Sequence, residues 1–323
     1  MTSLPTAPTP PTPCGNGARA NLDRIRSLAD HLGSNILGQP HIIPQVTAAL
    51  QNGELALTDP ARPRGTFLFL GPTGVGKTEL TLTFTRHLIG EDHLIRLDMS
   101  EYQTQEALGI LLGRSESEEG LFSKRYQATG GKGTLLLDEI EKAHPRVLDI
   151  LLQILDAARV TMANGTTLDL SQFYVVCTSN IASHAILDAR CSVRSTLVRF
   201  VEGQAQAQLR PEVFARFDTV CVFDKLAFDE VVPIAELLLK RELGLHQNQH
   251  GVTISYADDV PHYLASEGFH SRLGARPMRR VIESKVREIM RVALLSEAAA
   301  EGTLEVERAE GEHGVGKLVL RGA

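Results

Sequence analysis

Residues 71–78 read Gly-Pro-Thr-Gly-Val-Gly-Lys-Thr and fit the pattern G-x-x-x-x-G-K-[ST] of a phosphate-binding loop. The glycines allow backbone N–H groups to turn toward a phosphate without Cβ clashes, and a helix beginning at the end of the loop adds partial positive charge. Lys77 is expected to reach the β- and γ-phosphates, and the Thr78 hydroxyl to bind Mg²⁺. The alternative is a chance glycine-rich turn, but the apolar run before the loop and the helical pattern after it favour a nucleotide site.

Two adjacent carboxylates, Asp138 and Glu139, follow the apolar run 135–137. In a parallel sheet this run can lie beside the strand that precedes the phosphate loop. That arrangement would put Asp138 near Mg²⁺ and Glu139 near the attacking water as a general base. A solvated acidic turn is the alternative. Together with the loop, the pair predicts hydrolysis of ATP with Mg²⁺.

Five short apolar runs suit strands that are buried on both faces of a parallel sheet. They lie at residues 66–70, 94–97, 133–137, 173–177 and 219–223. Helical patterns fill most of the intervals between them. The alternation predicts an α/β fold with a doubly wound, five-stranded parallel sheet. Ligands bind such sheets at the carboxyl ends of the strands, where the loop and the acidic pair fall.

From about residue 226 the pattern changes to long helices, at 231–245 and 277–295, and then to two alternating segments that predict a short β-hairpin, at 303–306 and 317–320. The N-terminus is rich in Pro and Thr and offers little apolar surface to bury. The predicted parts are a disordered tail over 1–20, a large α/β nucleotide-binding domain over 21–225, and a smaller, mostly helical lid domain over 226–323.

The composition is that of an ordinary globular protein, with 43% hydrophobic and 22% charged residues in a chain of 323. The net charge of −6 argues against sequence-independent binding of nucleic acid. No segment approaches the ~20 apolar residues that cross a bilayer, and the N-terminus lacks the features of a secretory signal. The four cysteines show no metal-ligand spacing. We expect a cytoplasmic protein with no membrane contact and no bound metal beyond the Mg²⁺ of the nucleotide.

The order and spacing of the motifs resemble the second ATPase module of the Clp disaggregases and unfoldases, of the ClpA and ClpB type, within the AAA+ superfamily of P-loop NTPases. The resemblance extends from about residue 21 to residue 320. The stretches that carry it are 36–39 (Ile-Leu-Gly-Gln), 67–80, 96–102 (Arg-Leu-Asp-Met-Ser-Glu-Tyr), 137–145 (Leu-Asp-Glu-Ile-Glu-Lys-Ala-His-Pro), 177–180, 210–212 with Arg216, and 274–277 (Gly-Ala-Arg-Pro).

The resemblance implies roles that the residue pattern does not assign. Asn180 matches sensor 1, which orients the attacking water, although a turn asparagine at a strand end is the alternative. Arg216 matches the arginine finger that enters the site of the neighbouring subunit, although a surface salt bridge would also explain an arginine here. Arg276 matches sensor 2, which couples the lid to the nucleotide. The residues expected to bind ATP are Ile36, Leu37 and Gly38 at the adenine, with Pro72, Thr73, Gly74, Val75, Gly76, Lys77, Thr78, Glu79, Asp138 and Arg276; the expected Mg²⁺ ligands are Thr78 and Asp138, and the expected catalytic residues are Glu139, Asn180, Arg216 and Arg276.

An arginine finger supplied in trans implies a homo-oligomeric ring. The resemblance further implies that the ring is a hexamer and that it acts on a protein client. Two segments depart from the family. Residues 113–120 (Gly-Arg-Ser-Glu-Ser-Glu-Glu-Gly) are short and acidic, and lack the aromatic pore-loop side chain that grips a polypeptide. The segment between Asn180 and Arg210 lacks the Ile-Gly-Phe or Ile-Gly-Leu tripeptide that docks a peptidase. We therefore expect neither a standard threading mechanism nor a peptidase partner.

Three functions stay open. The leading one is an ATP-driven remodelling ATPase with a single ring layer, because the sequence holds neither the N-terminal substrate domain nor the first ATPase module of the large disaggregases. The second is a scaffold that assembles when ATP binds and recruits partners. The third is a nucleic-acid-associated AAA+ regulator, which the acidic net charge disfavours.

Overall fold

The computed structural model describes residues 16–115, 118–188, 193–295, 301–307 and 317–322. Most of the predicted tail therefore lies outside the described residues, as do residues 116–117 of the acidic segment. The first described helix, α1 (Asn16–Arg26), begins before residue 21, where the helical pattern was expected to start.

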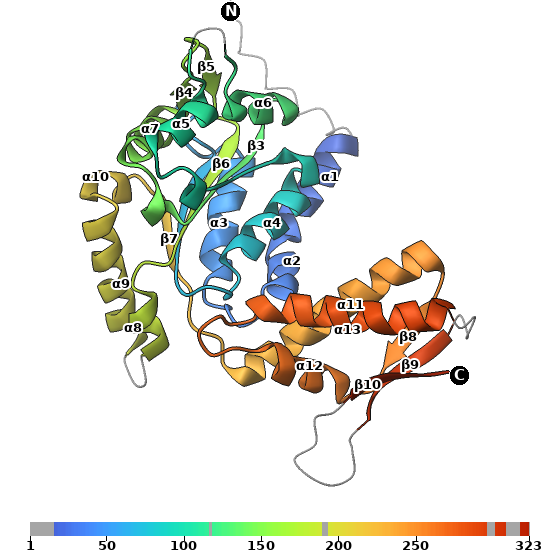
Figure 1. The fold of residues 1–323 in the computed structure, drawn as a ribbon. Helices are drawn as coiled ribbons and strands as arrows, with labels where there is room; N and C mark the ends of the chain where they lie inside the picture. Colours follow the sequence, from blue (N-terminus) through green and yellow to red (C-terminus); the bar gives the residue numbers. More distant parts are fainter. Residues whose placement is uncertain (1–15, 116–117, 189–192, 296–300, 308–316, 323) are drawn as a thin grey trace, which may run out of the picture.

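The central sheet has five parallel strands in the order β2-β3-β6-β1-β7. They are β1 (Gly65–Leu70), β2 (Leu94–Asp98), β3 (Gly133–Asp138), β6 (Phe173–Ser179) and β7 (Thr219–Val222). All five predicted strands and the predicted doubly wound parallel sheet are confirmed. Figure 1 shows the helices packed around this sheet and the C-terminal elements set to one side.

The prediction that the strand of Asp138 lies beside the strand before the phosphate loop is wrong. β6 lies between β3 and β1, because it pairs in parallel with both of them. The carboxyl ends of all three strands still meet at the same edge of the sheet. Thr178, near the end of β6, bridges the gap by donating a hydrogen bond to Asp138 Oδ1 at 2.9 Å.

Side chains of β1 alternate between two cores, one on each face of the sheet. Phe67 and Phe69 join the first core, and Leu68 and Leu70 join the second. The first face is covered by α2 (Leu28–Asn35), α3 (Ile43–Glu54) and α4 (Lys77–Leu88), and the second by α5 (Gln105–Leu112), α6 (Leu121–Ala128), α7 (Pro145–Ala157) and α9 (Arg194–Gln208). Burial of β1 along its whole length follows from this double cover.

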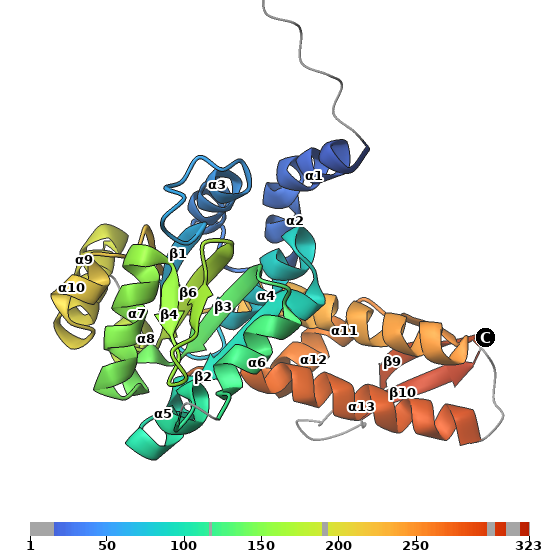
Figure 2. The same ribbon diagram turned by 90° about the horizontal axis from the view of Figure 1, so that it is seen from above.

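The C-terminal part is a helical lid with a small sheet. Its elements are α11 (Phe228–His250), β8 (Thr253–Tyr256), α12 (Val260–Gly268), α13 (Arg276–Leu295), β9 (Glu301–Glu307) and β10 (Lys317–Gly322). β9 and β10 form the predicted hairpin, and β8 adds a third strand parallel to β9 that was not predicted. Figure 2 shows these elements extending away from the central sheet.

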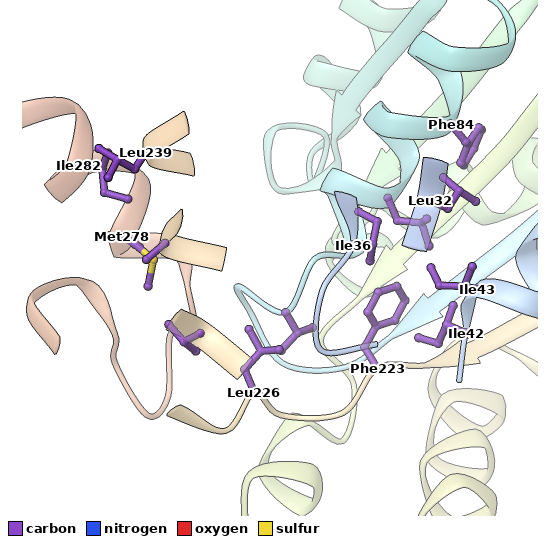
Figure 3. Packing of buried hydrophobic residues seen from close by; sticks show 14 of the residues in the cluster. Leu32, Ile36, Ile42, Ile43, Phe84, Phe223, Leu226, Leu239, Met278 and Ile282 are labelled. Carbon is purple, nitrogen blue, oxygen red and sulfur yellow. The ribbon is translucent and has the colours of Figure 1, made fainter. Parts of the chain in front are cut away.

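One apolar core runs without interruption from the large domain into the lid. Figure 3 shows Leu226 between the lid residues Leu239, Met278 and Ile282 and the large-domain side of the core, where Phe223 lies. Packing of this kind holds the two parts in contact, and the phosphate loop lies at their junction.

The remaining described elements are short. A β-hairpin that was not predicted, β4 (Arg159–Thr161) with β5 (Thr167–Asp169), lies against the start of the acidic segment, where the Ala163 N–H donates to the Leu112 carbonyl at 3.1 Å. The others are η1 (Glu91–His93), η2 (Met99–Glu101), η3 (Ile140–Lys142), α8 (Ser183–Asp188) and α10 (Pro211–Phe214). Within the described ranges, no helix combines the length and the apolar character needed to span a membrane.

Candidate functional site

The phosphate loop joins β1 to α4 and needs its glycines. Gly71, Gly74 and Gly76 have φ angles of 146°, 78° and 105°, a region that side chains with a Cβ rarely adopt. Lys77 and Thr78 follow directly in the first turn of α4. The free N–H groups of this turn therefore face the loop, as anion binding requires.

Lys77 is the buried cation of the site, with 8% of its surface exposed. Its Nζ donates to the carbonyls of Gly71 and Pro72 and, at 3.0 Å, to Asn180 Oδ1. Burial lowers the pKa of Lys77 to about 8, and the nearby carboxylates, Glu141 foremost, oppose that shift. The ammonium group is thus held at the loop by oxygen atoms that a phosphate could replace.

Asp138 is buried and accepts hydrogen bonds on both oxygens. Oδ1 accepts from the hydroxyls of Thr78, at 3.2 Å, and Thr178, and Oδ2 accepts from Arg96 Nε at 2.8 Å. Thr78 and Asp138, which were predicted to share a Mg²⁺ ion, are therefore in direct contact. Hydroxyl and carboxylate oxygens are the ligands that Mg²⁺ prefers, so this donor set fits the ion.

Glu139 is held by partners on both carboxylate oxygens. Asn180 Nδ2 donates to Oε1 at 3.3 Å, and Lys142 Nζ lies 2.6 Å from Oε2. The backbone of Glu139 is left-handed, with φ 57° and ψ 50°, which is uncommon for a residue with a Cβ. Its N–H donates to Thr178 Oγ1 at 3.2 Å, and this bond fixes the unusual turn at the end of β3.

Asn180 follows β6 and connects the cation with the carboxylate. Its Oδ1 accepts from Lys77 and its Nδ2 donates to Glu139, while its backbone N–H donates to Glu141 Oε1 at 3.1 Å. A hydrogen-bonded line therefore runs from Lys77 through Asn180 to Glu139. The structure brings together three residues whose sequence numbers span more than a hundred positions.

These residues line a cavity of ≈ 370 Å³ between the large domain and the lid. Most of the predicted binding residues line it, but Gly38 and Pro72 are not among its lining residues in the described part of the chain. Gly38 packs against the lid instead, since a Cβ there would lie 2.4 Å from Leu226 Cδ2. The lining also includes the apolar residues Ile36, Leu37, Leu82, Leu226, Ile234, Leu237 and Leu238.

Three arginines that were given no role in the sequence analysis also line the cavity: Arg96, Arg241 and Arg279. Arg96 lies in a motif that the resemblance rests on, and Arg279 lies one helical turn after Arg276. The motif could have pointed to Arg96, and the spacing of one helical turn could have pointed to Arg279. Arg241 had no such signal, because it comes from the middle of a long lid helix.

Arg216, in contrast, lies away from this cavity. The residue precedes β7, and in the described structure it is not among the lining residues. Its Nε pairs with Asp156 Oδ1 at 2.8 Å, and its side chain is 52% exposed. The structure therefore does not bring Arg216 to the other predicted catalytic residues of the same chain.

Family comparisons agree with this geometry. An AAA domain model (Cdc48 subfamily) matches residues 62–220, and the model of the C-terminal D2-small domain of ClpB matches residues 226–306. The chain belongs to the Clp-type AAA+ ATPases. The two matches meet near residue 226, where the apolar core passes from the large domain into the lid.

Relatives of this Clp-type chain include chaperone proteins. It is 38% identical over 282 residues to the chaperone protein ClpB 2 of Parasynechococcus marenigrum, covering 85% of this chain and 31% of that protein. It is 36% identical over 280 residues to the chaperone protein ClpB of Bacillus cereus, covering 84% and 32%. The chain thus spans about a third of the length of these relatives.

Solved structures of Hsp104 share the fold. A closed-state reconstruction of Hsp104 with ATPγS and FITC casein has a TM-score of 0.81 and 27% identity, covering 95% of this chain and 53% of that one. The extended S. cerevisiae Hsp104–casein complex has a TM-score of 0.79 and 29% identity, covering 93% and 52%.

In this Clp-type chain the phosphate loop touches the lid through backbone atoms. The Ala275 N–H donates to the Gly74 carbonyl at 3.1 Å, and a Cβ on Gly74 would lie 2.0 Å from the Leu273 carbonyl oxygen. No side chain fits at this contact without separating the loop from the turn before α13. Loop geometry and lid position are therefore mechanically coupled.

Gly74→Ala is expected to weaken nucleotide binding about tenfold or more, because the new Cβ both strains the loop and pushes on the lid turn. Titration with a fluorescent ATP analogue measures the effect. Gly165→Ala is the matched control: Gly165 has φ +79°, close to the +78° of Gly74, but nothing lies within 4 Å of its Cβ position. Equal affinity in both variants would contradict the coupling.

Glu79 ties α4 to the lid. Its Oε1 accepts from Arg241 Nη1 at 2.8 Å, and Arg279 Nη2 lies 3.9 Å from Oε2. Arg241 also donates to Asn35 Oδ1 at 2.7 Å. Glu79 was predicted to bind the nucleotide; it does line the cavity, and in this structure its charge is paired with lid arginines.

A double-mutant cycle of Glu79→Gln with Arg241→Gln is expected to give a coupling free energy of about 1 kcal/mol in urea unfolding, since the two side chains are only partly exposed, at 28% and 33%. The control cycle uses the exposed ion pair of Arg86, on α4, and Glu91, in the turn that follows α4, whose charged atoms lie 3.1 Å apart. A coupling free energy of a few tenths of a kcal/mol is expected for this pair. A coupling no larger than that of the control would show that Glu79 does not hold the lid.

Proposed function

We propose that the chain hydrolyses ATP with Mg²⁺ and uses the cycle to remodel a protein or a protein assembly. The observation that carries this proposal is the hydrogen-bonded line Lys77–Asn180–Glu139, which lies beside the Thr78–Asp138 pair in one cavity. A cation, a polar sensor, a base and a pair of Mg²⁺ ligands are the parts that phosphoryl transfer to water requires. Membership of the Clp-type AAA+ ATPases supports the same reaction.

Different residues of the cavity would bind the adenine, the phosphates and Mg²⁺. Ile36 and Leu37 offer an apolar surface for the adenine, and the loop N–H groups with Lys77 bind the phosphates. Thr78 and Asp138 would hold Mg²⁺, which neutralises phosphate charge when bound. Arg276 lines the same cavity from the first residue of α13, which supports the proposed role of connecting the lid with the phosphates.

Glu139 is the proposed general base. Asn180 and Lys142 hold its two oxygens, which restricts its orientation. A carboxylate held in this way can accept a proton from water. Asn180 contacts both Glu139 and the phosphate-binding Lys77, so its amide can transmit the presence of the γ-phosphate to the base.

Arg216 is the proposed arginine finger, and it would act in trans. It precedes β7, whose residue Thr219 aligns with Phe67 of β1, whereas the phosphate loop begins after the opposite end of β1. At about 3.3 Å per residue, the four residues from Phe67 to Gly71 alone span roughly 13 Å, farther than an arginine side chain extends. A ring of identical subunits, with six as the proposed number, would present Arg216 to the neighbouring site.

A protein client is supported by the structures of Hsp104, whose complexes hold casein. Residues 113–120 offer no aromatic side chain, so we propose remodelling without a standard aromatic pore loop. We likewise propose that no peptidase partner docks, since the tripeptide for that contact is missing between Asn180 and Arg210. The cytoplasmic location stays a prediction.

The test is phosphate release from Mg-ATP, with and without candidate protein clients, together with the fluorescence of a folded reporter. Client-stimulated hydrolysis with loss of reporter fluorescence supports the remodelling ATPase. The absence of a pore aromatic keeps the scaffold function as a second candidate. ATP-dependent assembly without any unfolding activity would favour the scaffold, and salt-sensitive binding of DNA or RNA would favour the nucleic-acid-associated regulator.

A further inference from the structure

Arg62 donates three hydrogen bonds to residues in and around the segment that holds Arg216. It lies just before β1, and its guanidinium group donates to three oxygens: Nε to the Leu155 carbonyl at 3.1 Å, Nη1 to Asp218 Oδ1 at 3.0 Å, and Nη2 to the Arg216 carbonyl at 2.8 Å. The Leu155 carbonyl lies near the end of α7, whereas Asp218 and Arg216, the proposed finger, lie in the segment that precedes β7. One rigid guanidinium group therefore joins the end of α7 to the segment that precedes β7.

Thr66 alone cannot provide this anchor. Its hydroxyl lies 2.7 Å from Asp218 Oδ2 and 3.3 Å from the Arg216 carbonyl. A hydroxyl has one proton, and the shorter contact to a carboxylate is the stronger hydrogen bond. The Arg216 carbonyl therefore depends mainly on Arg62.

Arg62 also sits beside the partner of the finger's side chain. Arg216 Nε pairs with Asp156, and Arg62 binds the carbonyl of Leu155, the preceding residue. Within the part of the chain that is described, Arg62 is not among the residues that line the nucleotide cavity. Its contacts thus converge on Arg216 and not on the ATP site of its own chain.

We propose that Arg62 is a positioning residue for Arg216 and acts, through it, on the ATP site of the neighbouring subunit. This inference rests on the proposed function, in which Arg216 works in trans. Without Arg62, the Arg216 carbonyl loses its main hydrogen-bond donor, and the guanidinium of Arg216 shifts. A misplacement of about 1 Å is enough to lower a catalytic rate about 10²-fold.

Arg62→Ala in the full chain is therefore expected to lower kcat about 10²-fold, with unchanged affinity for a fluorescent ATP analogue. Arg64→Ala is the matched control. Arg64 lies at the same strand start and pairs with Glu54 at 3.0 Å, but it has no contact with Arg216 among the described interactions. The control is expected to lose stability and to keep kcat. An unchanged kcat in Arg62→Ala would overturn the proposal.

Subunit mixing separates positioning from a general structural role. Glu139→Gln subunits carry intact Arg62 and Arg216 but lack the proposed base, whereas Arg62→Ala subunits carry an intact ATP site. A mixture is expected to hydrolyse ATP at least about tenfold faster than either variant alone, because Glu139→Gln subunits supply the finger. Arg62→Lys, which retains one charge and has fewer donors, is expected to show a smaller loss and the same rescue, should the alanine variant fail to fold.

The reference is a mixture of Glu139→Gln subunits with Arg216→Ala subunits, which take the place of the Arg62 variant. Rescue of Arg216→Ala without rescue of either Arg62 variant would overturn the positioning role and leave the finger in place. Failure to rescue Arg216→Ala would contradict the trans finger of the proposed function itself. The two failures are therefore distinguishable.

Discussion

Arg216→Ala is expected to lower the rate of ATP hydrolysis about 10³-fold or more and to leave nucleotide affinity unchanged. The reason is its place in the fold: Arg216 lies at the edge of the sheet opposite the phosphate loop and contributes nothing to the cavity of its own chain, as far as the described residues show. Its effect on catalysis must then come through a neighbour. Phosphate release gives the rate, and titration with a fluorescent ATP analogue gives the affinity.

The fold of the Arg216→Ala variant should survive. The ion pair with Asp156 is 52% and 43% exposed, and pairs of this kind contribute about 0–1 kcal/mol. Arg86→Ala is a suitable control, because Arg86 is 51% exposed and pairs with Glu91 in a similar way. The control should keep its rate. Normal turnover by Arg216→Ala would exclude the trans finger.

Glu139→Gln is expected to lower hydrolysis about 10²–10⁴-fold while ATP stays bound. Glutamine has the same shape and can still accept a hydrogen bond from Asn180, but its amide cannot accept the proton of the attacking water. Single-turnover phosphate release measures the loss. Retention of ATP by the protein on gel filtration measures binding, and a stabilised oligomer is expected in the same experiment.

The Glu139→Gln variant also gives access to the client, since whatever remains attached to the ATP-bound protein can be recovered with it. Glu91→Gln, at a side chain that is 75% exposed, serves as the control for an isosteric change outside the site. If Glu139→Gln protein hydrolysed ATP at the normal rate, Glu139 would not be the base.

The five strands and the phosphate loop were predictable because their signals are local. A buried parallel strand such as β6 must be apolar on both faces, so it reads as a continuous run in the sequence. A loop that turns its N–H groups inward needs glycine at fixed positions, and Gly74 and Gly76 adopt the positive φ angles that this requires. The third strand of the lid sheet was missed because β8 has no fully buried residue and so lacks a continuous apolar run, and because its partner β9 is remote in sequence.

The roles of Asn180, Arg216 and Arg276 needed the family resemblance in addition, because a single polar residue at a strand or helix end has many uses. The structure places Asn180 and Arg276 at the cavity and Arg216 away from it. Their catalytic roles remain predictions that the variants above test.

The sequence by itself determined the five strands of the central sheet, their order along the chain and the chemistry of the phosphate loop, because each depends on residues a few positions apart. Only the tertiary structure decided the rest. It inserted β6 between β1 and β3, paired Glu79 with Arg241 across the lid junction, and bound Arg62 to the carbonyl of Arg216. Each of these contacts joins segments far apart in the chain, so it exists only after the sheet and the lid have packed and has no periodic signal in the sequence.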